Sequence, residues 1–433
     1  MSEAAVEAAA RPLPTRAVGP LQLLALGLNG IVGVGIFFTP ASVAQLAPGR
    51  AAIVAFALTG LALVPVALAF ATLGRLFDED GGPVVFARAA FGDFASFLVG
   101  WVAYVSAFLS TSAVMVGLSN AAAPKLGLDG PVASRAFVTC LVAVLALIVA
   151  SGIRISARAW TSLTVLKLVP LGALLAAYFL YSGPAVPTVS GGETAWLGAG
   201  LVILFTFQGF EIVPVIAGQV KSSARAVPLA TVGALLLAIL LYVGLVAACV
   251  AALPGLAQSS APLADAAGVF GGAGLAALVD FGTSVSAFGI SLGMMVTTPR
   301  YLSALASGRR ALFDLERLDG KGVPRRAVFV TWILVTVLVN AGGLGELFAL
   351  SSIAVLMQFG VTAASLVALA MRRFRGLRPI DAWPALPTFA VGITLVTFGA
   401  SRREGLVALG TVVVGLALAR FAKVRGQRDD PKQ

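Results

Sequence analysis

Histidine is absent from this chain, and charged residues make up only 11% of its 433 residues. With no histidine, no metal-ligand cluster and no nucleophile–base pair, the sequence shows no catalytic or metal centre and implies no cofactor. A soluble domain carries about 25% charged residues, so a chain that is 59% hydrophobic lacks the polar surface such a domain needs. These scarcities argue against a soluble protein and against an enzyme.

Cysteine is also scarce. Cys140 and Cys249 are the only two in the sequence, and each lies inside an apolar segment. Two isolated cysteines in such segments indicate neither a disulfide framework nor a metal site.

Long hydrophobic runs are what the chain has in place of charge. A helix needs about 20 apolar residues to cross the hydrocarbon core of a bilayer. The sequence predicts an all-α integral membrane protein with twelve spans, at about 19–46, 51–76, 93–119, 132–151, 156–182, 196–218, 226–252, 275–306, 327–343, 345–371, 383–400 and 404–422.

The net charge of +11 follows from the distribution of Lys and Arg among the loops. If the N-terminus is cytoplasmic, most of the basic residues fall on the inner side. The outer side then holds Arg50, Lys125, Arg135, Arg402 and Arg403. Because cytoplasmic loops are enriched in Lys and Arg, both termini are expected in the cytoplasm. Nucleic-acid binding is not needed to explain the charge.

Two segments interrupt apolar runs with glycine and polar residues: Asn29–Pro40 in the first span and Phe205–Glu211 in the sixth. An interrupted helix leaves backbone groups free, which is tolerated only where they line a protein-enclosed cavity. Paired breaks in corresponding halves indicate a transporter binding site. The alternative for Gly33 and Gly35 is close helix packing, for which small residues are also used.

The two breaks are five spans apart, so the second half enters the membrane from the opposite side. This spacing predicts a 5+5 inverted repeat. We expect a cytoplasmic tail at 1–18, repeats at 19–182 and 196–371, two further helices within 383–422, and a C-terminal tail at 423–433. A short extracellular helix is also expected within 253–274.

The breaks suit a zwitterion. The amides of Val34, Gly35 and Ile36 would open the outer half-helix, where a partial positive charge favours a carboxylate. Carbonyls of the inner half-helix and of the second break would suit an ammonium group.

Three charged residues lie at membrane depth, where a charge is energetically costly and usually has a function. Glu211 would either hold the second break by accepting backbone hydrogen bonds or titrate during transport. Lys167 would either extend to the cytoplasmic surface or point inward as a cation. Asp280 is interpreted as a solvated residue near the outer end of its span.

The segment Gly33–Phe37 with Pro40 resembles the first-span motif of the amino acid–polyamine–organocation (APC) superfamily. Phe205–Glu211 and Ala217–Pro228 are similar to its sixth-span and following cytoplasmic signatures, and the resemblance covers roughly 19–375. Two further segments match as well, namely Gly81–Trp101 and Arg300–Pro324.

This resemblance implies a LeuT-type fold and secondary active or exchange transport. It places a substrate carboxylate at the amides of Val34 and Gly35, and an ammonium at the carbonyls of Ile31, Phe205 and Gln208. Lys167 matches a lysine that stands where relatives hold sodium, which implies proton coupling or exchange. The full set of expected substrate-binding residues is Ile31, Gly33, Val34, Gly35, Ile36, Phe205, Phe207, Gln208, Gly209 and Met294, with Lys167 and Glu211 in coupling or gating.

Three departures from the family pattern matter. Val34 replaces a serine, Ser222–Ala224 replaces a Lys-Asn-Pro continuation, and Met294 replaces an aromatic residue of the arginine/agmatine branch. Loss of an aromatic face argues against a guanidinium pocket, so a neutral amino acid is expected.

The sequence therefore predicts an amino acid symporter or exchanger in a bacterial inner membrane. A polyamine or organic cation carrier and a non-transporting sensor remain as alternatives. The expected partners are an amino acid, protons and the lipid bilayer.

Overall fold

The computed structural model describes residues 18–33, 35–128, 130–152, 157–183, 193–306 and 314–428. Within these ranges every regular element is a helix, and the one β-bridge pairs Val18 with Val220. The elements are α2 (Pro20–Ile31), α3 (Gly35–Leu46), α4 (Arg50–Ala62), α5 (Val64–Gly74), α6 (Pro83–Phe91), α7 (Asp93–Ala122), η1 (Pro124–Leu126), α8 (Pro131–Ala150), α9 (Ala157–Leu180), α10 (Trp196–Phe207), η2 (Phe210–Gln219), α11 (Ser223–Ala252), η3 (Leu256–Gln258), α12 (Pro262–Ala306), α13 (Arg325–Ala341), α14 (Leu344–Met371), η5 (Phe374–Gly376), η6 (Pro379–Ala382), α15 (Ala385–Thr394), η7 (Leu395–Gly399) and α16 (Arg402–Arg428).

Eight helical segments of the described chain are long and apolar enough to cross a membrane, and the bent pair α2–α3 makes a ninth. The eight are Arg50–Gly74, Asp93–Asn120, Pro131–Ala150, Trp196–Gly218, Ser223–Ala252, Pro262–Ala306, Leu344–Met371 and Pro379–Gly399. The other three predicted spans correspond to α9, α13 and α16. An all-α membrane protein is thus confirmed, whereas the number twelve and the repeat boundaries stay predictions.

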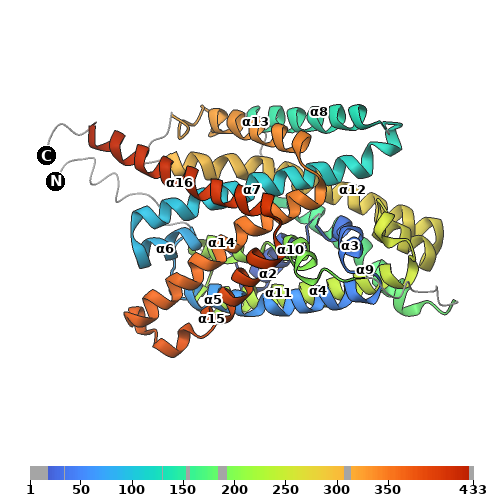
Figure 1. Ribbon diagram of the computed structural model, residues 1–433, viewed down its shortest axis with the longest axis horizontal. Coiled ribbons are helices and arrows are strands. Elements are labelled where there is room, and N and C mark those ends of the chain that lie inside the picture. Colours follow the sequence, from blue (N-terminus) through green and yellow to red (C-terminus); the bar gives the residue numbers. More distant parts are fainter. Residues whose placement is uncertain are drawn as a thin grey trace.

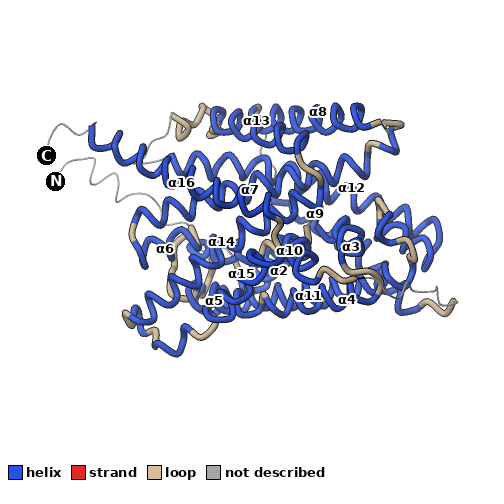
Figure 2. The backbone as a smooth tube through the Cα atoms, in the orientation of Figure 1, coloured by secondary structure: helices blue, strands red, loops and turns tan. Residues whose placement is uncertain are grey.

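The helices form a layered bundle (Figures 1 and 2). In Figure 1, α8 and α13 lie together along one edge, α7 and α12 pass through the middle, and α4, α5 and α11 lie toward the opposite edge. Figure 2 shows that the loops are short and lie mainly at the ends of the bundle, with further non-helical segments near α2 and α10. The short helix α6 lies at one end, and the start of α12 at the other.

The start of α12 contains the short helix expected within 253–274. Gly272 has a φ of 69° and separates this first part of α12 from its long remainder. A left-handed φ is accessible to glycine at little cost, so this residue lets the chain turn before the span begins.

Glycines bring α2, α4 and α5 against α11. A methyl group added at Gly27 would lie 3.1 Å from Ala234, one at Gly60 would lie 2.7 Å from Ile239, and one at Gly74 would lie 2.7 Å from Val227. Small residues allow such close approach of helices in membranes. Helix α2, the part of the first span that precedes the break, is therefore packed closely against α11.

Candidate substrate site at two broken helices

The first break separates α2 from α3. Helix α2 ends at Ile31, α3 begins at Gly35, and the two axes differ by 42°. Val32 caps α2 with a non-helical ψ of 78°. The break predicted within Asn29–Pro40 is present, although Val34 lies outside the described residues.

The second break follows α10. Gln208 adopts an extended conformation, Gly209 has a φ of 126°, and the chain then continues as the 3₁₀ helix η2, which is kinked at Ile216. Only glycine adopts the backbone of Gly209 without strain. The break predicted within Phe205–Glu211 is therefore present as well.

The two breaks touch each other through their glycines. A methyl group added at Gly209 would lie 2.4 Å from both the carbonyl carbon and the oxygen of Gly30. The reverse substitution at Gly30 would place its methyl 3.2 Å from the Gly209 oxygen. Sequence reasoning missed Gly30, because nothing in one sequence shows which glycine faces the other break.

Gly33 and Gly35 differ in their surroundings. A methyl group at Gly35 would lie 3.0 Å from the Cα of Thr206 and 3.3 Å from the ring of Phe205, so packing alone accounts for a glycine there. At Gly33 the nearest atoms would be 3.6 Å away, on Ile290 and Ile31, which is an ordinary contact. Packing therefore explains Gly35 but leaves Gly33 unexplained.

Lys167 braces the end of α2 from the neighbouring helix α9. Its side chain is buried, and Nζ donates to the carbonyl oxygens of Asn29 at 2.9 Å and Val32 at 2.5 Å. These carbonyls belong to the C-terminal turn of α2, where the helix dipole favours a cation. The lysine points inward, in agreement with the second of the two orientations considered from the sequence.

Tyr242 of α11 also donates to this end of α2. Its hydroxyl lies 2.8 Å from the Ile31 oxygen, which accepts a second bond from the Gly33 amide at 2.6 Å. A carbonyl oxygen has two lone pairs, so a substrate ammonium would have to displace one of these donors. Sequence reasoning missed Tyr242, which lies deep within a uniformly apolar run.

Glu211 holds the second break from within. Its Oε2 accepts a hydrogen bond from the Gly209 amide at 2.8 Å. A carboxylate in the first turn of a helix also interacts favourably with the helix dipole. This contact agrees with the structural role considered from the sequence, while a role in coupling stays a prediction.

The aromatic candidates point to different sides of α10. Phe205 is 7% exposed and pairs with Phe348 of α14, with ring centroids 4.3 Å apart. Phe207 is fully buried between Phe56 and Tyr242, on the side of α4 and α11. The structure thus brings Phe205 next to Gly35, and it gives Phe207 a packing role.

Ile36 and Met294 complete the predicted set. Ile36 is fully buried in the main core, and Met294 of α12 is partly buried against the same core. No hydrogen bond or ring contact between either side chain and the break is present among the described residues. Their role in binding stays a prediction.

A polar cluster that the sequence did not single out lies beside Gln208. Ser110 of α7 and Ser351 of α14 have their hydroxyl oxygens 2.6 Å apart. Both are within reach of the Gln208 Oε1, at 3.4 and 3.3 Å. The cluster joins the second break to two helices that come from distant parts of the chain.

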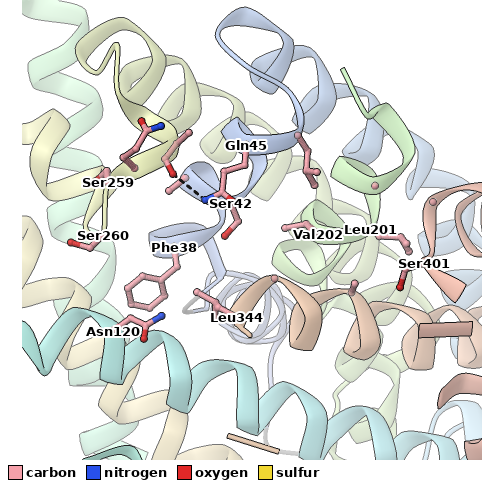
Figure 3. A pocket seen from close by; sticks show the side chains of 18 of the residues that line it. Phe38, Ser42, Gln45, Asn120, Leu201, Val202, Ser259, Ser260, Leu344 and Ser401 are labelled. Atoms are coloured by element: carbon pink, nitrogen blue, oxygen red, sulfur yellow. Dashed lines mark hydrogen bonds between the residues drawn. The ribbon is translucent and has the colours of Figure 1, made fainter. Parts of the chain in front are cut away.

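A cavity of about 870 Å³ opens on the side of the breaks that the charge pattern places outside (Figure 3). Its walls come from α3, α10, the start of α14 and the segments around Ser259 and Ser401. Phe38 and Leu344 lie near one another on this cavity, beside Asn120. Among the described residues of its lining, Glu404 is the one charged side chain, and its carboxylate also accepts from the Ser401 amide.

The Phe38 ring borders the cavity toward α7. A methyl group added at Gly117 would lie 2.8 Å from this ring, which shows how closely the ring rests on α7. On α10, Phe205 follows the lining residue Val202 by about one turn, and on α14 Ser351 lies two residues after the lining residue Ala349. The cavity therefore extends along both helices toward the Gln208 cluster.

Comparison with known proteins identifies the family. The amino acid permease family matches residues 18–410. The chain is a member of that family. This permease therefore belongs to the APC superfamily and is a transporter, as the motifs at both breaks predicted.

Its relatives have transporter names. It is 28% identical to an uncharacterized transporter of Mycobacterium tuberculosis over 420 residues, which cover 94% of this chain and 90% of the relative. It is 26% identical to a glutamate/serine transporter of Bacillus subtilis, over 79% of this chain and 69% of the relative.

A solved structure shows the same fold. A mutant manganese transporter of Eremococcus coleocola superposes with a TM-score of 0.59 at 17% identity, covering 94% of this chain and 96% of that chain. At this identity the likeness shows the fold alone. Together with the two broken helices it confirms the predicted LeuT-type architecture.

Proposed function

We propose that this permease carries neutral amino acids across a membrane by alternating access. The observation that carries the proposal is the contact between two broken helices, at Gly30 and Gly209. Unwound backbone at membrane depth offers amides and carbonyls that suit the two charged ends of an amino acid. We place the permease in the lipid bilayer of a bacterial inner membrane, with both termini in the cytoplasm.

The two charged side chains described at the breaks, Lys167 and Glu211, are both bonded to backbone groups, which supports a neutral substrate. Glu211 is the carboxylate at the second break, and it already accepts from Gly209. A polyamine or organic cation carrier would need further carboxylates there. The name of the Bacillus subtilis relative, a glutamate/serine transporter, is consistent with an amino acid substrate.

Lys167 supports proton coupling or plain exchange. Its ammonium lies against Asn29 and Val32, where a metal cation would otherwise be attracted by the same carbonyls. A sodium ion beside it would be repelled, so sodium coupling is not expected.

Two groups of helices would move relative to each other. Helices α2, α4, α5 and α11 pack together with η2, while α7, α8, α12 and α13 form a second set of contacts. A transported substrate must bind the occluded arrangement better than the open ones, since only differential affinity shifts the equilibrium.

The test is uptake of a labelled amino acid mixture into proteoliposomes. Vesicles would be empty or preloaded with unlabelled amino acids, with and without an inward proton gradient. Uptake that requires preloading indicates an exchanger, and uptake driven by the gradient indicates a proton symporter. Absence of uptake by folded protein, with uptake of labelled putrescine instead, would favour the polyamine carrier; binding without uptake of either would favour a sensor.

A further inference from the structure

The hydrogen bonds around Gln208 leave donors unused. The Ser110 and Ser351 hydroxyls are close enough for one to donate to the other, and the second can donate to the Gln208 Oε1. The Gln208 Nε2 is buried and has no hydrogen-bond partner among the residues that the structure describes. An amide nitrogen carries two donors, so the cluster has donors to spare while its serine oxygens retain acceptor capacity.

A buried donor without a partner is costly in an otherwise satisfied structure. Leaving one unpaired costs about 1–3 kcal/mol, and native proteins rarely keep such groups without a purpose. A bound group that accepts from Gln208 and donates to a serine oxygen would use both capacities. A hydroxyl or a carboxamide does this; a methyl group or an ammonium does not.

The position of the cluster connects it to the first break. Ser351 lies about one turn after Phe348 on α14, and the Phe348 ring is in contact with that of Phe205. The Phe205 ring would be 3.3 Å from a methyl group at Gly35. A molecule held at the breaks by its backbone groups would therefore have its side chain within reach of this cluster.

The three side chains come from three separate elements of the fold. Gln208 belongs to a broken helix, Ser110 to α7 and Ser351 to α14. A side chain that bridges them would bind the arrangement in which they meet more tightly than one in which they separate. Recognition and closure would then depend on the same hydrogen bonds.

We propose that Ser110, Ser351 and Gln208 bind the side chain of the transported amino acid and select small side chains that carry a hydroxyl or a carboxamide. This inference rests on the proposed function, because it assigns the substrate class of the same site. It distinguishes serine, threonine and asparagine from alanine, leucine and arginine.

Serine and alanine are the sharpest pair, because they differ by one hydroxyl. Wild-type proteoliposomes should take up serine about tenfold more efficiently than alanine, as one net hydrogen bond predicts. Ser351→Ala and Ser110→Ala should each bring this ratio close to one. Ser351→Thr, which keeps a hydroxyl, should restore the preference for serine.

Thr331→Val is the matched control. The Thr331 hydroxyl lies 3.1 Å from that of Tyr104 in another buried polar pair, between α13 and α7 and away from the breaks. Its loss should leave the serine-to-alanine ratio unchanged. The melting temperature of each variant shows whether it remains folded, and the substrate series on the wild type requires no variant.

The outcomes separate the two proposals. Uptake of amino acids with equal rates for serine and alanine, or a preference for leucine or arginine, would overturn the assigned substrate class and leave amino acid transport standing. An unchanged ratio in both serine variants would do the same. Failure to take up any amino acid would overturn the proposed function and this inference with it.

Discussion

The two breaks are held in different ways. At the first break, the carbonyls at the end of α2 are occupied by Lys167 and Tyr242, which come from two other helices. At the second, Glu211 bonds the amide of its near neighbour Gly209, and the Gln208 amide nitrogen is left with no partner in the described chain. Side chains of other helices therefore hold the first break. A residue of its own segment holds the second, where the Gln208 amide nitrogen remains free, among the described residues, to donate hydrogen bonds.

This contrast indicates that the two breaks have different roles in binding. The first break is suited to backbone recognition, because its geometry is fixed by groups that do not belong to it. The second is suited to side-chain recognition, because the amide nitrogen of Gln208 has no hydrogen-bond partner in the described chain. Three substitutions at the breaks test the division, from the largest expected effect to the smallest, and a fourth in a loop away from both breaks is expected to have the least effect of all.

Gly209→Ala should have the largest effect. The new methyl group would lie 2.4 Å from Gly30 and would require a φ of 126° from a residue other than glycine. Strain and overpacking together should cost about 2–4 kcal/mol. The melting temperature should fall sharply and binding should be lost.

Gly33→Ala is the matched control for this substitution, because its methyl group has room. Its melting temperature should remain close to that of the wild type. Equal stability of both variants would show that the two breaks do not meet at Gly30 and Gly209.

Lys167→Ala should lower transport at least tenfold, since two helix-terminal carbonyls lose their donor. If the lysine takes part in coupling, the pH dependence of the remaining uptake should also change. Uptake measured across a range of pH checks both effects. An unaltered pH profile would remove Lys167 from coupling and leave it as a brace.

Lys321→Ala controls for the loss of a lysine that caps a helix. Lys321 Nζ donates to the Ser151 oxygen at the end of α8, far from both breaks in the chain. Transport by this variant should match the wild type.

Tyr242→Phe should have a moderate effect. The ring remains packed on Phe207, and only the hydroxyl at the Ile31 oxygen is removed. If a substrate ammonium must displace this donor, substrates should bind about two- to fivefold more tightly. Equilibrium binding measures this, and weaker binding would mean that the hydroxyl instead positions the break.

Asp319→Asn should have the smallest effect. Backbone amides of Val323 and Lys321, with Arg325 beside them, hold the pKa of this loop carboxyl below its ordinary value. A depressed pKa adds stability above the unfolded-state pKa, and this is lost as the pH falls through the folded-state value. The variant should melt slightly earlier at neutral pH, with the difference vanishing in acid; a constant difference would exclude the linkage.

The sequence was sufficient to predict an all-α membrane protein and both breaks. Continuous apolar runs indicated the spans, and glycine with polar residues marked the interruptions at Gly33 and Gly209. Their local origin explains this success, because a break is encoded by the residues that form it.

Contacts between distant segments could not be predicted. Gly30, Tyr242, Ser110 and Ser351 act through partners between about 100 and 240 positions away in the chain, and each is unremarkable in its own segment. One sequence carries no signal for such pairing. Phe207 illustrates the same limit, because its side of α10 depends on where α4 and α11 pack.

The central claim is that substrate binds where the two broken helices meet. Its most direct test is equilibrium binding of labelled serine to purified wild type and to Gly33→Leu, with melting temperatures of both. The account predicts saturable binding to the wild type and loss of binding in a variant that stays folded, because a leucine at Gly33 would place its side chain at the first break, where a methyl group would meet only ordinary contacts of 3.6 Å with Ile290 and Ile31. Undiminished binding by folded Gly33→Leu would contradict the account.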